Sequence, residues 1–217
     1  MSAGQPVTAE YMTFTANIEY GRDLIEAGRS LTKLGVNVFD IGDLYRAAWT
    51  QAVSALDHWL HEEISARVKV LADETSGRPH ALQTFALPLA VVDDVRLNGK
   101  LFRMALAEEV RKSMSRKTLQ NPDDIAAGLK LVYDGGDLWR KVAARLKTPP
   151  PGDEATWSQD SIKAALRAIM KRRNQIAHEA DLDNNGDRRA ITDVDAANMI
   201  DLLEDTATAI AAVVEGC

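Results

Sequence analysis

Three side chains that could do chemistry together lie within six residues of each other: Arg173, Asn174 and His178. A guanidinium stays protonated and can hold a phosphate or carboxylate through two parallel hydrogen bonds. An imidazole gains or loses a proton near neutral pH, and an amide can orient it or donate to an anion. This combination is suited to holding an anionic group and moving a proton beside it.

The residues around this motif predict one helix from about residue 158 to 180. Because successive helical residues turn by about 100°, Arg173 lies in the middle of an apolar stripe formed by Leu166, Ile169, Met170, Ile176, Ala177 and Ala180. A guanidinium that faces a core needs a carboxylate partner, a bound anion or a cleft that admits water. A structural ion pair with Asp57 is therefore one interpretation of Arg173, and a surface or capping role is one interpretation of His178.

The rest of the chain predicts an all-α, bundle-like protein. Apolar residues recur at three- and four-residue steps, and the helices expected from them span about residues 11–34, 43–73, 99–115, 121–132, 137–146 and 192–214, with a short helix or turn within 82–98. Asp57 and His61 lie four residues apart on one edge of the second helix. We expect residues 1–42 to form an N-terminal extension whose helix packs on the bundle, and residues 43–217 to form the helical domain.

Composition limits the possible functions. The net charge of −6 over 217 residues argues against a protein that binds nucleic acid through bulk electrostatics, although Lys171 and Arg172 could form a local basic patch. The single cysteine is Cys217, so a disulfide framework is not expected. No apolar run approaches the roughly 20 residues of a membrane span, and a cytoplasmic protein without a membrane partner is expected.

A second motif begins at Asp181, where Asp181, Asp183, Asn185 and Gly186 follow the opening of a calcium-binding EF-hand loop. The twelfth position of that loop requires a glutamate but is Thr192 here, and the ninth is Arg189. A cation in a ligand position and a missing carboxylate predict a polar turn rather than a metal site.

Several segments together resemble one family. The motif Arg173-Asn174-Gln175-Ile176-Ala177-His178 late in an all-helical chain resembles the arginine-x4-histidine signature of HEPN domains (higher eukaryotes and prokaryotes nucleotide-binding). The segments Leu56–Ile64 and Thr118–Ile125, with Trp139, resemble the RiboL-PSP-HEPN subgroup of that family. The resemblance covers about residues 43–214.

The resemblance implies a HEPN-type helical bundle and a metal-independent endoribonuclease, in which the 2′-OH of RNA attacks the adjacent phosphate in the composite active site of a homodimer. It implies that Arg173 binds the phosphate, that His178 moves the proton and that Asn174 supports them. Asp57 or His61 could pair with Arg173 or hold His178, and Lys171 and Arg172 could contact the RNA backbone.

The same resemblance suggests a defence, stress or toxin context with an antitoxin or regulator, and no cofactor. The alternative is a non-catalytic HEPN module that binds nucleotide or RNA, or that serves as a protein-interaction subunit.

Overall fold

The computed structural model describes residues 8–74, 76–150 and 155–216, which form nine helices and no β-strand. The prediction of an all-α protein is confirmed for these residues, whereas Cys217 and the first seven residues lie outside them. The helices are α1 (Ala9–Lys33), α2 (Gly42–Asp73), α3 (His80–Gln83), α4 (Leu89–Leu97), α5 (Phe102–Met114), α6 (Pro122–Leu129), α7 (Leu138–Ala143), α8 (Gln159–His178) and α9 (Asp193–Glu215).

Local capping residues explain where several helices begin. The Thr8 side chain accepts a hydrogen bond from the Tyr11 amide at the start of α1. Asn121 caps α6, and Pro122 occupies the first helical position, where its missing N–H has no helical partner to lose. Because such signals act within a few residues, the helix positions predicted from the sequence lie close to the observed ones.

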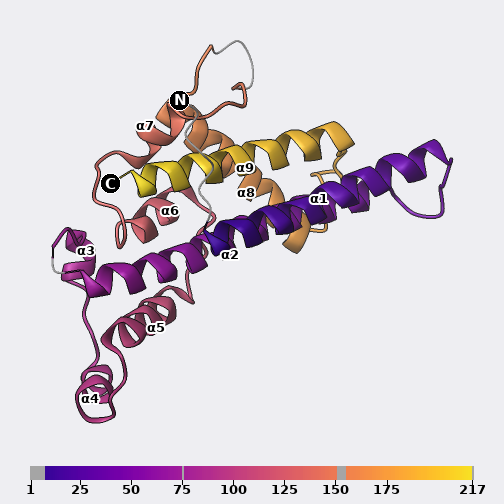
Figure 1. Ribbon diagram of the computed structural model, residues 1–217. Coiled ribbons are helices and arrows are strands. Elements are labelled where there is room, and N and C mark those ends of the chain that lie inside the picture. The colour runs from indigo at the N-terminus through magenta and orange to yellow at the C-terminus, as the bar shows by residue number, and fades with distance from the viewer. Residues whose placement is uncertain (1–7, 75, 151–154, 217) are drawn as a thin grey trace.

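The long helices α1 and α2 run side by side, and several of the other helices pack against them (Figure 1). Trp59 and Leu60 of α2 are almost fully buried, and Phe14 of α1 packs against the Trp59 ring with the ring centroids 5.4 Å apart. Helix α9 contacts both α1 and α2, while α5 packs on the second half of α2 and α8 contacts α2 and α7. The core therefore follows α2, which contacts α1, α5, α6, α8 and α9.

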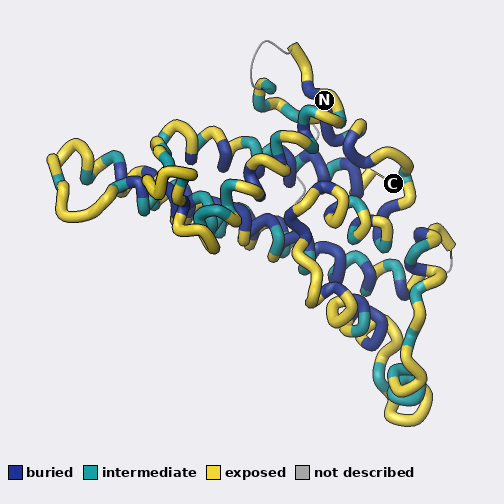
Figure 2. Tube along the Cα trace, turned by 180° about the vertical axis from the view of Figure 1, so that it is seen from behind, coloured by how far each residue is buried: buried dark blue, intermediate teal, exposed yellow. Residues whose placement is uncertain are grey.

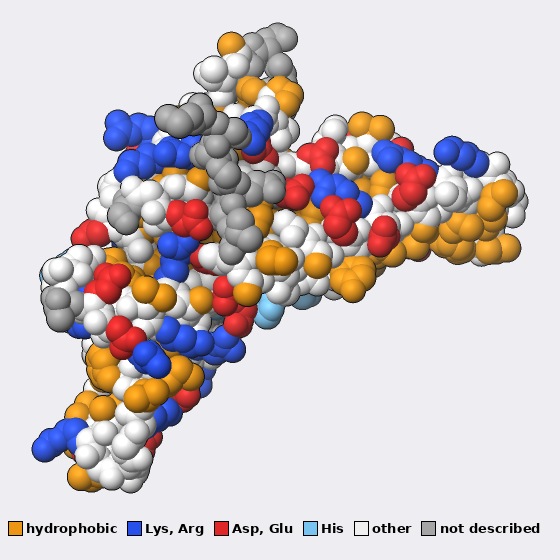
Figure 3. Space-filling view, viewed as in Figure 1, with side chains coloured by type: hydrophobic (Ala, Val, Ile, Leu, Met, Phe, Trp, Pro, Cys, Tyr) orange, Lys and Arg blue, Asp and Glu red, His pale blue; other side chains and the backbone are white. Residues whose placement is uncertain are grey.

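Two ends of the molecule extend away from this core (Figure 2). One is the α1–α2 connection, where Leu34, Val38 and Phe39 are all exposed, and Figure 3 shows hydrophobic side chains gathered at this end. The other is α4, which has no buried residue and contacts α5. No described helix has an apolar stretch long enough to cross a membrane.

Candidate functional site

Helix α8 carries the arginine-x4-histidine motif and is anchored most firmly in its first three turns. A capping box between Ser158 and Ser161 fixes its start. Its buried residues are Ile162, Leu166, Ile169 and Met170. The indole Nε1 of Trp49, from α2, donates a hydrogen bond of 3.1 Å to the backbone oxygen of Ile169. The packing face predicted from the sequence is correct as far as residue 170.

The last turns of α8 do not continue that packing. Ile176 is half-buried, and Ala177 and Ala180 are exposed. The apolar stripe predicted through residue 180 is therefore wrong in its second half, where Ile176 is only partly buried beside α2 and the two alanines are exposed. The motif lies where the helix passes from the core to the surface.

Arg173 lies at this transition and has an unusual set of contacts. Its Nη1 donates to Oδ1 of the neighbouring Asn174 at 3.2 Å, and its Nε is buried without a hydrogen-bond partner. Within the described ranges, no carboxylate forms an ion pair with Arg173. The structural interpretation of Arg173 as half of an ion pair with Asp57 is thus wrong, and a guanidinium with unused donors remains.

His178 is the last residue of α8, and both it and Asn174 are exposed. No hydrogen bond joins His178 to Arg173 in the part of the chain that is described. An angular separation of about 140° on the helix explains this, because the two side chains leave α8 in different directions.

Asp57 and His61 have a different partner from the one predicted. Asp57 accepts a hydrogen bond from the Leu119 backbone amide, and Nε2 of His61 lies 3.2 Å from the Lys117 backbone oxygen. Both side chains hold the connection between α5 and α6 against α2. The prediction that either residue pairs with Arg173 or supports His178 is wrong, because this connection occupies them.

Lys171 and Arg172 are neighbours with different environments. Lys171 is exposed and lines a cavity of about 390 Å³ beside α8, together with Asn174. Arg172 instead turns inward, and its Nη2 lies 3.0 Å from Oδ2 of Asp181 and 3.0 Å from the Ala190 backbone oxygen. Arg172 therefore belongs to an internal ion network, whereas Lys171 lies exposed at the cavity.

The ion network around Asp181 is the feature that sequence reasoning missed. Asp181 is fully buried, and its Oδ2 accepts a hydrogen bond of 2.8 Å from Nε of Arg46, which is itself buried in α2. Burial lowers the pKa of Arg46, but hydrogen bonds to Asp181 and Asp40 outweigh it and raise that pKa overall. Burial lowers the pKa of Arg172, and Asp181 offsets this only in part. The sequence signal that could have indicated this network is Arg46, an arginine among apolar residues near the start of α2.

The EF-hand-like segment that begins at Asp181 contributes a carboxylate to this ion network and forms a polar turn. Asp181 faces two guanidiniums, and Oδ1 of Asp183 accepts hydrogen bonds from the backbone amides of Asn185 and Asp187. These contacts use one oxygen of each carboxylate, and Oδ1 of Asp181 is buried without a hydrogen-bond partner. Among the described residues there is no grouping of three histidine, cysteine or acidic side chains that could hold a metal ion.

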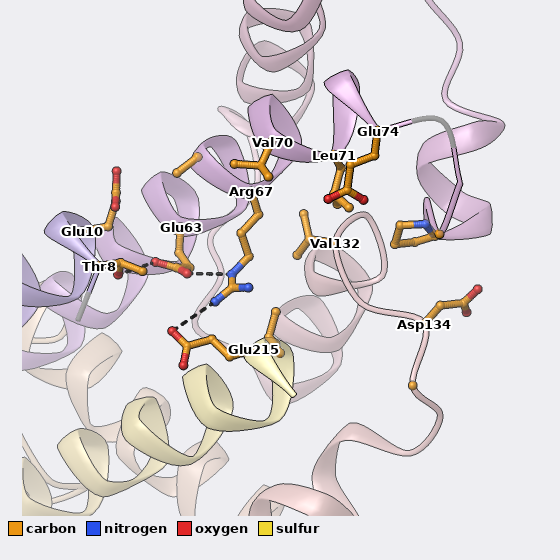
Figure 4. Close-up of a pocket in the computed structure, with 15 residues that line it drawn as sticks. Thr8, Glu10, Glu63, Arg67, Val70, Leu71, Glu74, Val132, Asp134 and Glu215 are labelled. Atoms are coloured by element: carbon orange, nitrogen blue, oxygen red, sulfur yellow. Dashed lines mark hydrogen bonds and ion pairs between the residues drawn. The ribbon is translucent and has the colours of Figure 1, made fainter. Parts of the chain in front are cut away.

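A larger cavity of about 840 Å³ lies elsewhere, between the second half of α2, the end of α9 and the connection between α6 and α7. Glu63 accepts hydrogen bonds there from Thr8 and Arg67, and Glu215 lies 3.8 Å from Arg67 (Figure 4). Five acidic residues line it against one arginine. Its charge opposes phosphate binding, so its size does not make it the site of the chemistry that the motif suggests.

Comparisons with family models, with curated proteins and with solved structures find no match to this chain. The second half of α8 provides the Arg173 guanidinium with unused donors and three exposed side chains, those of Lys171, Asn174 and His178.

Proposed function

We propose that the protein is a metal-independent endoribonuclease of the HEPN type, with the active site formed by α8 of two identical chains. The observation that carries the proposal is Arg173. A guanidinium that is half-buried, has a buried Nε without a partner and forms no ion pair in the described residues is costly to the fold. A phosphate supplies the acceptors that such a guanidinium lacks.

The chemistry follows from what RNA and these side chains provide. The 2′-OH of RNA attacks the adjacent phosphorus while the bond to the 5′-oxygen breaks. One proton leaves the 2′-OH and one is delivered to the 5′-oxygen, so a base and an acid are both needed. His178 supplies one of them, Arg173 stabilises charge on the phosphate, and Asn174 donates to a phosphate oxygen or orients the imidazole.

A second chain supplies what one chain lacks. One α8 offers a single imidazole, and that imidazole leaves the helix about 140° from Arg173. Two copies that face each other bring two imidazoles and two guanidiniums to one cleft. The exposure of Ala177 and Ala180 supports a partner at this surface.

The exposure of His178, without a described contact that orients its ring, favours a second candidate function. A HEPN module that binds RNA or nucleotide through Arg173 and Lys171 without cutting it requires no positioned imidazole. The two functions differ in the effect of removing His178 alone. A binding module keeps its RNA binding without this side chain, whereas a ribonuclease loses cleavage.

The experiment is RNA cleavage in excess EDTA by the wild-type chain, His178→Ala and the control His58→Ala. His58 is an exposed histidine of α2 and matches His178 in exposure. We expect wild type and His58→Ala to cut a mixed structured and single-stranded RNA, and His178→Ala to bind it without cutting. Absence of cleavage by wild type, or equal cleavage by all three, would contradict the ribonuclease.

A further inference from the structure

The turn that follows His178 adopts a backbone conformation that its residues disfavour. Ala180 and Asp181 have φ angles of 50° and 58°, in the left-handed region where glycine is the usual residue. The Asp181 amide donates to the backbone oxygen of Gln175 at 3.0 Å, an oxygen that also accepts from the Glu179 amide, and this closes the end of α8. Two consecutive non-glycine residues hold this conformation only where other contacts impose it.

The contacts that impose it come from the side chain of Asp181. Its Oδ2 lies 2.8 Å from Nε of Arg46 in α2 and 3.0 Å from Nη2 of Arg172 in α8. The segment after the turn joins the same network, since Arg189 donates its amide to the Asp181 backbone oxygen at 2.8 Å and accepts from Arg46 at its own backbone oxygen at 2.7 Å. One buried carboxylate thus connects two helices and the returning segment of the chain.

This network acts where apolar packing is missing. Ile176 is half-buried and Ala177 is exposed, so the last turn of α8 has little hydrophobic contact to fix it. Asp181 follows His178 by three residues and is fully buried. The ion network is the described feature that holds the final turn of α8, with His178 on it, to α2.

We propose that Asp181 is a positioning residue for His178, acting through Arg46 and Arg172 as a latch on the end of α8. The catalytic part of this inference rests on the proposed ribonuclease function. Without the latch, the turn is released from its left-handed conformation and the imidazole moves relative to Arg173. The apolar core along α2 includes none of the three latch residues, although Arg46 is itself buried on that helix.

The test compares Asp181→Asn with Glu63→Gln, a matched loss of charge at another buried carboxylate that pairs with an arginine. Two readouts do not depend on activity: the NMR signals of the His178 ring, and hydrogen exchange of the amides of residues 175–182. In Asp181→Asn we expect faster exchange in this segment and altered His178 signals. Glu63→Gln should leave both as in wild type.

Cleavage gives the third readout. Since a small displacement of a catalytic group can cost up to about a hundredfold in rate, we expect kcat of Asp181→Asn to fall on the order of tenfold or more with KM nearly unchanged. If Asp181→Asn does not fold, Arg172→Lys provides the same comparison, because lysine keeps the positive charge but lacks the planar guanidinium that pairs with Asp181.

Unchanged His178 signals and exchange in these variants, or the same changes in Glu63→Gln, would overturn the latch. If the wild-type chain cuts no RNA, the ribonuclease proposal fails, and the NMR and exchange results alone decide whether the latch holds the turn.

Discussion

Arg173 and Arg172 are adjacent arginines that the structure uses in opposite ways. Nη2 of Arg172 pairs with Oδ2 of the fully buried Asp181, whereas Arg173 leaves its own buried Nε without a partner. The contact of Arg172 stabilises the fold, whereas the unpaired Nε of Arg173 lowers its stability and leaves donors available to a ligand. This contrast gives the first prediction.

We expect Arg173→Met to leave the melting temperature unchanged or raise it, because a buried donor without a partner costs about 1–3 kcal/mol and methionine removes it. About 1 kcal/mol corresponds to roughly 2–4 °C in a chain of this size. Arg172→Met should instead destabilise the protein by about 1.5–3 kcal/mol, since Asp181 loses a charged partner. Thermal unfolding measures both, and a strongly destabilised Arg173→Met would mean that Arg173 is structural.

Sequence reasoning could find Arg173 because its position depends only on the period of one helix. It could not find the role of Arg172, because the contact that decides it includes Arg46, which lies 135 residues from Asp181 in the chain. The same limit explains Asp57 and His61, whose partners at Leu119 and Lys117 are 62 and 56 residues away. Helical spacing predicts the face of the helix on which a residue lies. Which residues pack against that face depends on the tertiary structure.

At the scale of elements, the helices were predictable because caps and hydrophobic spacing are local. The end of α8 was not, since the apolar stripe continues in the sequence into Ala177 and Ala180, which are exposed. The close approach of α1 to α2 was not predictable either, because helical propensity marks Gly28 only as a weak point in its own helix. A Cβ placed on Gly28 would lie 2.5 Å from the ring of Tyr45.

The second prediction therefore concerns the packing of α1 on α2. We expect Gly28→Ala to lower the melting temperature, because overpacking costs about 1–3 kcal/mol and exceeds the gain of about 1 kcal/mol that alanine brings to a helix. Ser30→Ala, an exposed change on the same helix, should leave stability nearly unchanged. A more stable Gly28→Ala would show that Tyr45 moves aside at little cost.

At the scale of the whole molecule, the site on α8 is half of what the proposed reaction needs. The third prediction is that the chain is a dimer at micromolar concentration, measured by light scattering together with size-exclusion chromatography. Placing a charge in the uncovered end of α8, as in Ala177→Glu, should shift the protein toward the monomer without lowering its melting temperature as a core substitution would. A monomeric wild-type chain would contradict a composite active site.

The most direct test of RNA cleavage at this site is to offer the wild-type chain one sequence as RNA and as the same strand lacking every 2′-OH, both in EDTA. If the 2′-OH is the nucleophile and no metal is required, only the RNA is cut, and its new ends carry a 2′,3′-cyclic phosphate or the 3′-phosphate formed from it. Cleavage of both strands, cleavage that requires an added metal ion, or no cleavage of the RNA would contradict this function.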